Sequence, residues 1–490
     1  MQPQVYHSPV YHRQVIQAWE QRWFQQNNSA YGLMQQVAWF ISQRLIVLFK
    51  DKNIQKIAVC CGQGNNAGDG YLISKYLKQA GLNVDIYAAE KGQSAQLKKA
   101  QKEALDCGVE IYPHFDFKIQ YDAYIDALFG IGLNRALDEQ WQTIIQAINH
   151  QQGLKIAVDI SSGLNANTGR AMPVCIQADY TYTILGLKAG LFTGQAKEFV
   201  GMLELISAIP PDDTLRPMAY LSHTSVSLPK RKAYGHKGSY GHVLVIGGHA
   251  TMGGAVIMAA EAAFASGAGK VTVICDAKHH TAILARAPNI MLADINAMTE
   301  DERVSILQHI DAVCFGMGLG RDAWAKSQYE QWFNLLQNTD VDVILDADAL
   351  WFLAEQPNKV HPKTYLTPHP GEAAKLLGIS TAEIENDRIA AIHQLQERYA
   401  GQWVLKGSGS LTLENELYIC TAGNAGMGTG GMGDVLAGMI ASLKAQFHED
   451  IQLNEIVMLH ALAGDELAHT GERGLQAQDM KHAIYKIVNQ

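Results

Sequence analysis

Strand-like and helix-like segments alternate twice along this chain, and a stretch that fits neither pattern separates the two series. Alternation of this kind predicts βαβ units, in which parallel strands form a sheet with helices on both faces. In the first series, a helical run at Leu33–Phe49 comes before predicted strands at Ile57–Cys61, Asn83–Tyr87, Tyr124–Leu128 and Lys155–Asp159, with a helix at Tyr71–Gln79.

The alternation stops between residues 210 and 238, where Pro, Ser and charged residues cluster. Such a composition is typical of a linker. Beyond it, strands are predicted again at His242–Ile246, Val271–Cys275, Ala312–Phe315, Val341–Leu345 and Gln402–Leu405. Because 490 residues exceed what one hydrophobic core supports, we expect two α/β domains, a Rossmann-like doubly wound domain at 1–215 and a second at 222–490.

Charge and cysteine content exclude several classes of protein. The formal net charge is −9 and no block of Lys or Arg occurs, which argues against a nucleic-acid or membrane partner. The seven Cys form no CxxC pair, which argues against a disulfide scaffold or a structural zinc site. With no signal-peptide pattern and no long apolar run, we expect a cytoplasmic protein that acts on small molecules.

The first candidate site is a glycine-rich segment, CCGQGNNAGDG, at residues 60–70 between a predicted strand and a predicted helix. A helix N-terminus after such a loop offers backbone N–H groups to an anion, although a tight turn that uses Asn and Asp is an alternative. Segments 126–135 and 158–169 also place an Asp at a strand end before a glycine-containing loop. Since ligands of open α/β sheets bind beyond the carboxyl ends of the strands, the three loops predict one crevice.

Residues 10–210 resemble the NAD(P)H-hydrate epimerases, whose loops read NNGGDG, D-x-(I/L)-FG-(I/T)-G and VD-(I/V)-PSG. The resemblance implies that Asp159 contacts the substrate and acts as acid or base, and Lys188 also matches a family position. The other residues implied to bind the hydrate are Asn65, Asn66, Ala67, Gly68, Asp69, Gly130, Ile131, Gly132, Leu133, Asn134, Arg135 and Ala136.

The same resemblance implies a potassium ion held by Asn66, Asp126 and Ser162. Their oxygen atoms suit a hard monovalent cation. The chain departs from the family pattern at Ala67, where Gly is usual, at Ser161, where Pro is usual, and at Gln35, where Glu is usual. Ala at position 67 would be strained at a positive φ but tolerated if Gly serves only close packing. A binding module without catalysis is therefore an alternative for this half.

The second candidate site is a denser glycine run at residues 422–443, with six glycines between Gly423 and Gly433 that lead into a predicted helix. Backbone N–H groups of such a loop can bind a phosphoryl group. Asp434 lies in the first turn of this helix, where it can take a proton from a substrate hydroxyl. An Asp favoured there only by the helix dipole is the alternative, but it leaves the six glycines unexplained.

The GxGD pattern is similar to that of ribokinase-like enzymes, and residues 225–490 resemble the ADP- or ATP-dependent NAD(P)H-hydrate dehydratases. KGSYGHVLVIGG, FGMGLGR, LDADAL, LTPHPGEAAKLLG and VLKGSGS carry this resemblance. It implies that the hydrate contacts Ala255, Gly318, His369 and Asp434. The adenine nucleotide would contact Lys406, Gly407, Ser408, Gly409, Ser410 and Gly433.

Two acidic residues near this site, Asp346 and Asp348, are expected to share one face of a strand end. There they could position substrate, or a Mg²⁺ ion and water near the phosphates. His369, between two prolines, could also be only a loop residue, and His279 and His280 are predicted at the surface.

The two resemblances occur together, in this order, in the bifunctional NAD(P)H-hydrate repair enzymes. Hydration gives R and S epimers at a ring carbon next to the nicotinamide nitrogen. The resemblance implies that the N-terminal half interconverts them and that the C-terminal half dehydrates the S epimer with ADP or ATP. We expect a homo-oligomer. The alternative is a ribokinase-like small-molecule kinase, in which the C-terminal half phosphorylates an alcohol and stops there.

Overall fold

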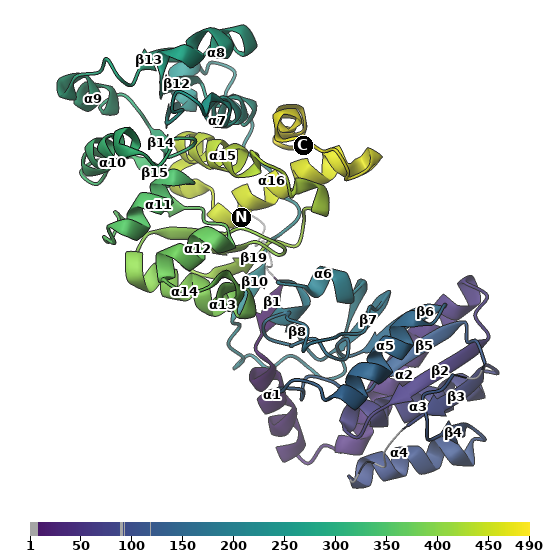
Figure 1. Cartoon of the computed structure of the whole chain (residues 1–490). Coiled ribbons are helices and arrows are strands. Elements are labelled where there is room, and N and C mark those ends of the chain that lie inside the picture. The colour runs from purple at the N-terminus through teal and green to yellow at the C-terminus, as the bar shows by residue number, and fades with distance from the viewer. Residues whose placement is uncertain (1–7, 89–91, 93, 118) are drawn as a thin grey trace. The chain divides into compact units, whose positions relative to one another are not determined.

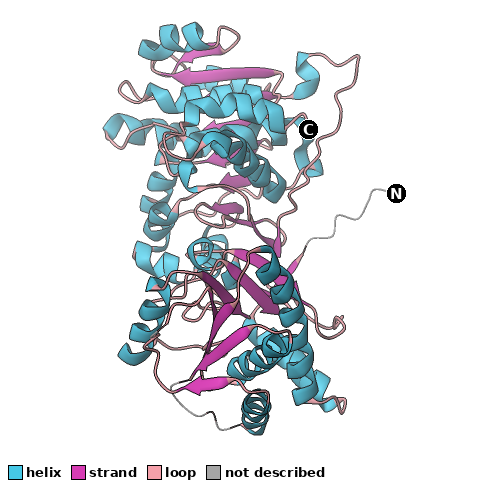
Figure 2. Ribbon diagram, turned by 90° about the vertical axis from the view of Figure 1, so that its right-hand side faces the viewer, coloured by secondary structure: helices cyan, strands magenta, loops and turns pink. Residues whose placement is uncertain are grey.

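The computed structural model describes residues 8–88, 92, 94–117 and 119–490. The chain divides into two compact units, one of Pro9–Ala219 and the other of Ser8 with Tyr220–Gln490 (Figure 1). In each unit a mainly parallel sheet lies between helices (Figure 2). The predicted α/β fold class is therefore confirmed.

The sheet of the unit Pro9–Ala219 has the strand order β4-β3-β2-β5-β6-β7-β9, and neighbouring strands run parallel. Its strands are β2 (Lys56–Cys61), β3 (Asn83–Tyr87), β4 (Glu110–Tyr112), β5 (Ala123–Ala127), β6 (Leu154–Val158), β7 (Tyr180–Ile184) and β9 (Met202–Ile206). The order reverses beside β2, and in doubly wound sheets this is where ligands bind.

Helices cover both faces of this sheet. One apolar cluster packs one face against α1 (Arg13–Gln25), α2 (Ala30–Asp51), α3 (Asn65–Gln79) and α4 (Ala95–Asp106). A second cluster packs the other face against α5 (Glu139–His150). Alternate residues of β2 enter the two clusters, because successive side chains of a strand point to opposite faces. The unit also contains α6 (Ala196–Phe199) and a short parallel pair, β1 (Pro9–Tyr11) with β8 (Leu187–Lys188).

The sheet of the other unit has the order β13-β12-β11-β14-β15-β16-β17-β18-β19-β10. Its strands are parallel as far as β17, whereas β18 runs antiparallel to both of its neighbours. The bounds are β10 (Ala219–Leu221), β11 (His242–Ile246), β12 (Lys270–Cys275), β13 (Met291–Asp294), β14 (Ala312–Phe315), β15 (Asp342–Leu345), β16 (Thr364–Leu366), β17 (Gln402–Leu405), β18 (Leu411–Leu413) and β19 (Leu417–Ile419).

One face of this sheet is covered by α7 (Gly253–Ala265), α15 (Met432–Phe447), α16 (Leu453–Leu467) and α17 (Met480–Ile487). On β14, Phe315 stacks on Tyr329 of α10 (Ala323–Leu336). The remaining helices are α8 (His280–Arg286), α9 (Glu300–Leu307), α11 (Asp348–Glu355), α12 (Pro370–Leu377), α13 (Thr381–Asn386) and α14 (Arg388–Tyr399). Among the described residues, no helix has both the length and the apolar character that a membrane span needs.

The predicted strands lie within one residue of the observed bounds at each end, and the run Leu33–Phe49 lies inside α2. Two expectations need correction. Helix α3 begins at Asn65 rather than Tyr71, because the segment expected to be a loop forms its first turns. The expected linker at 210–238 contains β10, which pairs with β19. Ala219 is buried, so this segment supplies apolar contacts that a purely polar linker would lack.

Candidate active sites

The carboxyl ends of β2, β5 and β6 border a cavity of about 1050 Å³. Helices α1 and α2 and the start of α3 supply other parts of its wall. Among the residues predicted to bind the hydrate, those that line it are Asn65, Asn66, Asp69, Gly130, Ile131, Gly132, Leu133, Asn134, Arg135, Ala136 and Asp159. The three predicted loops therefore meet at one site.

Ala67 and Gly68 serve packing in the first turns of α3. Ala67 is fully buried in the apolar core, and a Cβ on Gly68 would lie 2.6 Å from the Met34 sulfur. A Cβ on Gly70 would lie 2.6 Å from Ala127 Cβ. Because Ala67 has ordinary helical backbone, Ala in place of the usual Gly causes no strain there. These small residues let α3 pack closely on the sheet.

Asp159 follows β6 and has a strained backbone, with φ of 70°. Its carboxylate accepts a hydrogen bond from Lys188 Nζ at 2.5 Å and another from the Ile184 N–H at 3.1 Å. Lys188 is fully buried, and this burial lowers the pKa of its ammonium group although Asp159 opposes the shift. The short pair β1–β8 fixes the backbone at Lys188. Strain and a buried ion pair at a cavity wall are typical of a functional site.

The three residues predicted to hold potassium are all buried. The Ser162 hydroxyl donates to Asp126 Oδ1 at 2.6 Å, and the Ser162 N–H donates to Asp126 Oδ2 at 2.7 Å. Burial raises the pKa of Asp126 to about 6, and these hydrogen bonds oppose the shift. The Asn66 amide nitrogen has no hydrogen-bond partner among the described residues. Asp126 and Ser162 are thus in direct contact. Asn66 lines the cavity, whereas Asp126 and Ser162 lie behind its lining residues.

Sequence reasoning missed Glu20, which lines the cavity from α1. Burial is the main cause that raises its pKa, and the charge of Asp159 adds to the shift. Burial also raises the pKa of Asp69 well above its ordinary value, and Asp159 and Glu20 contribute. No motif surrounds Glu20, so only the alternation of apolar and polar residues on α1 could have placed it on an inner face.

In the second unit, the glycine run leads into α15. Gly431 precedes this helix with φ of 95°, a left-handed conformation that favours glycine, and no side chain caps the helix. The loop residues Thr429 and Gly430 are exposed, and a Cβ on Gly430 would meet nothing within 4 Å. The first turn of α15 therefore presents backbone N–H groups at an open surface, as an anion site requires.

Asp434 lies in the first turn of α15, as predicted. Burial raises the pKa of its carboxyl to about 7, and the charge of Asp346 adds to this shift while Lys406 opposes it. A carboxyl that titrates near neutral pH can act as a general base. A helix N-terminal Asp with only a structural role would be exposed to solvent and would have an ordinary pKa.

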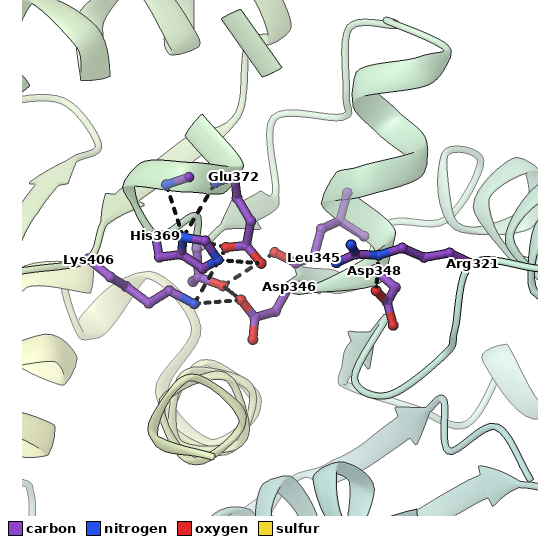
Figure 3. A network of polar contacts seen from close by, with 9 residues as sticks. Arg321, Leu345, Asp346, Asp348, His369, Glu372 and Lys406 are labelled. Atoms are coloured by element: carbon purple, nitrogen blue, oxygen red, sulfur yellow. Dashed lines mark hydrogen bonds and ion pairs between the residues drawn. The ribbon is translucent and has the colours of Figure 1, made fainter. Parts of the chain in front are cut away.

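Lys406 lies beside two acidic residues, Asp346 and Glu372 (Figure 3). Its Nζ donates to Asp346 Oδ1 at 2.9 Å and lies 3.9 Å from Glu372 Oε2. A Cβ on Gly433 would lie 2.9 Å from this same Nζ, so the glycine lets the lysine reach the start of α15. Gly407–Ser410 follow as the turn between β17 and β18, where the Gly407 N–H donates to Ser410 Oγ at 3.2 Å. Lys406 and Gly433, both predicted to contact nucleotide, are thus neighbours.

His369 caps α12 by accepting hydrogen bonds from the N–H groups of Gly371 and Glu372. Burial lowers its pKa, and the charge of Lys406 adds to this shift. Glu372 completes the cap by accepting from the His369 N–H at 2.8 Å. Burial raises the pKa of Glu372 to about 7. The sequence analysis missed Glu372, although a capping residue followed three positions later by Glu is a recognisable signal.

Asp346 and Asp348 do not lie on a strand end as predicted, although the charges of both raise the pKa of Asp434. The strand ends at Leu345, and Ala347 has φ of 50°, so the alternation of a strand does not continue through these residues. Asp346 contacts Lys406, whereas Asp348 accepts from Arg321 Nε at 2.7 Å (Figure 3).

Two further expectations concern substrate and surface residues. Ala255 and Gly318 are neighbours, because a Cβ on Gly318 would lie 3.3 Å from Ala255 Cβ. His279 and His280 were predicted at the surface, but both are half-buried. His279 Nε2 lies 2.9 Å from the His249 carbonyl oxygen, which accounts for its burial.

Two family models match the chain, one in each unit. Residues 30–190 match the YjeF-related protein N-terminus, and residues 243–486 match the NAD(P)H-hydrate dehydratase family. A bifunctional NAD(P)H-hydrate repair enzyme from Coxiella burnetii is 39% identical over 451 residues, which cover 89% of this chain and 90% of that protein.

Solved structures resemble the second unit. A ribokinase-like superfamily protein from Enterococcus faecalis is 31% identical, with a TM-score of 0.48, over 53% of this chain and 92% of its own. An ADP/ATP-dependent NAD(P)H-hydrate dehydratase from Bacillus subtilis, co-crystallized with ATP/Mg²⁺, is 25% identical, with a TM-score of 0.47, over 53% of this chain and 93% of its own.

Proposed function

The chain belongs to the family of bifunctional NAD(P)H-hydrate repair enzymes, and on that premise we propose how its residues divide the work of repair. The enzyme is an isomerase and a lyase: it epimerises hydrated NADH and NADPH and dehydrates the S epimer. We assign epimerisation to Pro9–Ala219 and dehydration to the unit that begins at Tyr220.

For dehydration, we propose that Asp434 is the general base. The hydroxyl of the S hydrate loses its proton to Asp434 while its oxygen forms a bond to the terminal phosphorus of ADP or ATP. The P–O bond to the rest of the nucleotide breaks, and AMP or ADP leaves. Phosphate is a far better leaving group than hydroxide, so the C–O bond then breaks and the ring loses a proton to restore NAD(P)H. The N–H groups at the start of α15 and the Lys406 ammonium stabilise the charge that develops on the phosphoryl oxygens.

The acidic residues of this site fit a Mg²⁺ ion. Asp346 and Glu372 both lie beside Lys406 and offer oxygen ligands. Within the described residues no three His, Cys, Asp or Glu side chains gather as a metal cage, and Mg²⁺ commonly uses one or two carboxylates with water and substrate phosphates. When bound, the ion would neutralise phosphate charge. We propose Asp346 and Glu372 as its holders.

Asn66, Asp126 and Ser162 fit a monovalent cation. Each offers an oxygen, and all three are buried. A bound K⁺ would offset the charge of Asp126 beside a phosphate-bearing substrate. We propose these residues as its holders.

For epimerisation, we propose that Asp159 is the acid or base that acts on the substrate. Lys188 fixes the position of Asp159 through the 2.5 Å contact. The carbon that carries the hydroxyl is bonded to nitrogen, so its C–O or C–N bond breaks readily and few catalytic groups are needed.

The observation that carries this proposal is Asp434, a carboxyl with a pKa of about 7 at the start of an uncapped glycine-led helix. The test supplies purified protein with the S hydrate and ADP or ATP. Dehydration yields free phosphate and the near-ultraviolet absorbance of the dihydronicotinamide. A small-molecule kinase would instead leave a phosphorylated hydrate without that absorbance.

A further inference from the structure

Four carboxyl groups line the N-terminal cavity: Glu20 on α1, Asp69 on α3, Asp159 after β6, and the exposed Asp138, which caps α5. Asp159 is paired with Lys188. Arg135 also lines the cavity, from an exposed loop. The described residues give the Glu20 carboxyl no hydrogen bond and no ion pair, so none of them accounts for this half-buried acid.

Glu20 is close enough to the proposed reaction centre for the charges of that centre to change its pKa. The charges that perturb it are those of Asp159, which raises its pKa, and Lys188, which lowers it. The pKa of Asp69, which lines the same cavity, is raised by burial first, then by the charge of Asp159 and by that of Glu20. An acid coupled to the Asp159–Lys188 pair, but held on a separate helix, can approach a bound ring from another side.

Epimerisation needs chemistry on both faces of one carbon. When the C–O bond is the one that breaks, the hydroxyl leaves from one face and a water adds to the other. Asp159 alone serves one face at a time, so a second proton-transfer group on another wall of the cavity would complete the requirement.

We propose that Glu20 is a second catalytic residue of the epimerase site and acts as the acid partner of Asp159. This inference rests on the epimerase function proposed above. The Glu20 carboxyl donates its proton to the hydroxyl of the R hydrate. The C–O bond breaks, water departs, and the ring-nitrogen lone pair forms a C=N bond.

A second water then adds to this planar carbon from the opposite face, and Asp159 accepts its proton. The electron pair of the C=N bond returns to nitrogen, which gives the S hydrate. One proton leaves Glu20 and one reaches Asp159, and exchange with solvent restores both groups. No oxidant, reductant or further reactant is needed.

The test uses Glu20→Gln in the full chain, with Glu139→Gln as the matched control. Glu139 undergoes the same chemical change at an exposed position on α5. The R hydrate is supplied with nucleotide, and recovery of absorbance is followed. We expect Glu20→Gln to lower kcat for the R epimer by about 10² to 10⁴-fold, with KM little changed. Dehydration of the S epimer, which the other unit catalyses, should be unchanged, and an unchanged thermal unfolding of Pro9–Ala219 in the full chain would show that the variant unit is folded.

Two further measurements separate catalysis from binding. In ¹⁸O-labelled water without nucleotide, S hydrate formed from R hydrate should carry the solvent oxygen. The wild-type rate should fall at high pH as the acid loses its proton, and Glu20→Gln should lack this decline.

Three results would overturn the proposal. One is a rise in KM alone, as expected if Glu20 only binds a ribose hydroxyl. The second is S hydrate that retains the original oxygen of the R hydrate. The third is an epimerisation rate that no longer falls at high pH in Asp69→Asn but still falls in Glu20→Gln. If the wild-type protein itself fails to convert the R epimer beyond a protein-free control, the epimerase function fails instead.

Discussion

The two sites of this protein share a topology but use glycine for opposite purposes. Each lies at the carboxyl ends of parallel strands, where a glycine-containing segment enters a helix. In α3, Gly68 and Gly70 let the helix pack against Met34 and Ala127. Before α15, Gly430 has open space around it and Gly431 adopts a left-handed backbone.

The charged groups of the two sites also differ. In the N-terminal cavity, a fully buried Lys188 holds Asp159 as a fixed ion pair. Around α15, Lys406 remains within reach of several carboxyl groups. A proton-transfer site needs a fixed acid or base, whereas a phosphoryl-transfer site needs accessible N–H groups and a cation. Both helices begin after a glycine without a side-chain cap, and a Cβ on Gly64 or on Gly430 would meet nothing within 4 Å. The open N-terminus is therefore common to the two sites, and the burial and pairing of the lysine distinguish them.

The largest expected effect is a loss of dehydration, which involves the second site alone. Asp434→Asn keeps the shape of the side chain but cannot accept the proton, so dehydration should fall by about 10² to 10⁴-fold. Nucleotide affinity should stay nearly unchanged, because a carboxylate adds little to phosphate binding. Turnover of the S hydrate and nucleotide titration measure the two effects. A variant that retains more than half of the wild-type turnover would remove Asp434 from the mechanism.

The next effect is confined to the N-terminal site. Asp126→Ala removes the charged member of the proposed potassium site, and we expect conversion of the R epimer to fall by about 10- to 100-fold. Replacing K⁺ with a large organic cation should have a similar effect on the wild-type protein. Dehydration of the S epimer serves as the control and should be spared. Full recovery of the R epimer in both experiments would show that Asn66, Asp126 and Ser162 serve only turns and packing.

A pair of glycine variants tests the comparison itself. Gly70→Ala places a methyl group against Ala127, and this overpacking should lower the free energy of unfolding of the N-terminal unit by about 1–3 kcal/mol. Gly430→Ala meets no atom within 4 Å and should leave stability unchanged while weakening nucleotide binding. Thermal unfolding and nucleotide titration would show both effects. If Gly430→Ala destabilised the fold and bound nucleotide normally, the nucleotide-binding role assigned to Gly430 would be wrong.

The smallest effect concerns pH. Asp434 must be ionised to act as a base, and its pKa is about 7. The kcat/KM for S-hydrate dehydration should therefore be lost as the pH falls through about 7, by about tenfold for each further pH unit. Asp346→Asn removes a neighbouring negative charge and should move this decline to lower pH. An unchanged midpoint in that variant would show that Asp346 does not control Asp434.

The sequence predicts the strands and the motif-bearing loops well, because buried parallel strands read as apolar runs and glycine loops stand out. It fails where a side chain acts without a motif. Glu20 enters the N-terminal cavity through the packing of α1, and the apolar–polar pattern of that helix specifies an inner face but not a cavity. Asp346 and Asp348 lie beyond the strand end because β15 stops at Leu345 and Ala347 takes a positive φ, a turn that strand periodicity cannot anticipate.

The central claim, that two sites act in sequence on the two epimers, is tested most directly with a mixed R/S hydrate and ADP or ATP. The account predicts that absorbance recovers fully in wild-type protein. With Asp159→Ala it should rise quickly only to the S fraction, because Asp159 serves the N-terminal site alone. Recovery by the wild-type protein that stops at the S fraction, or full and equally rapid recovery in Asp159→Ala, would contradict the account.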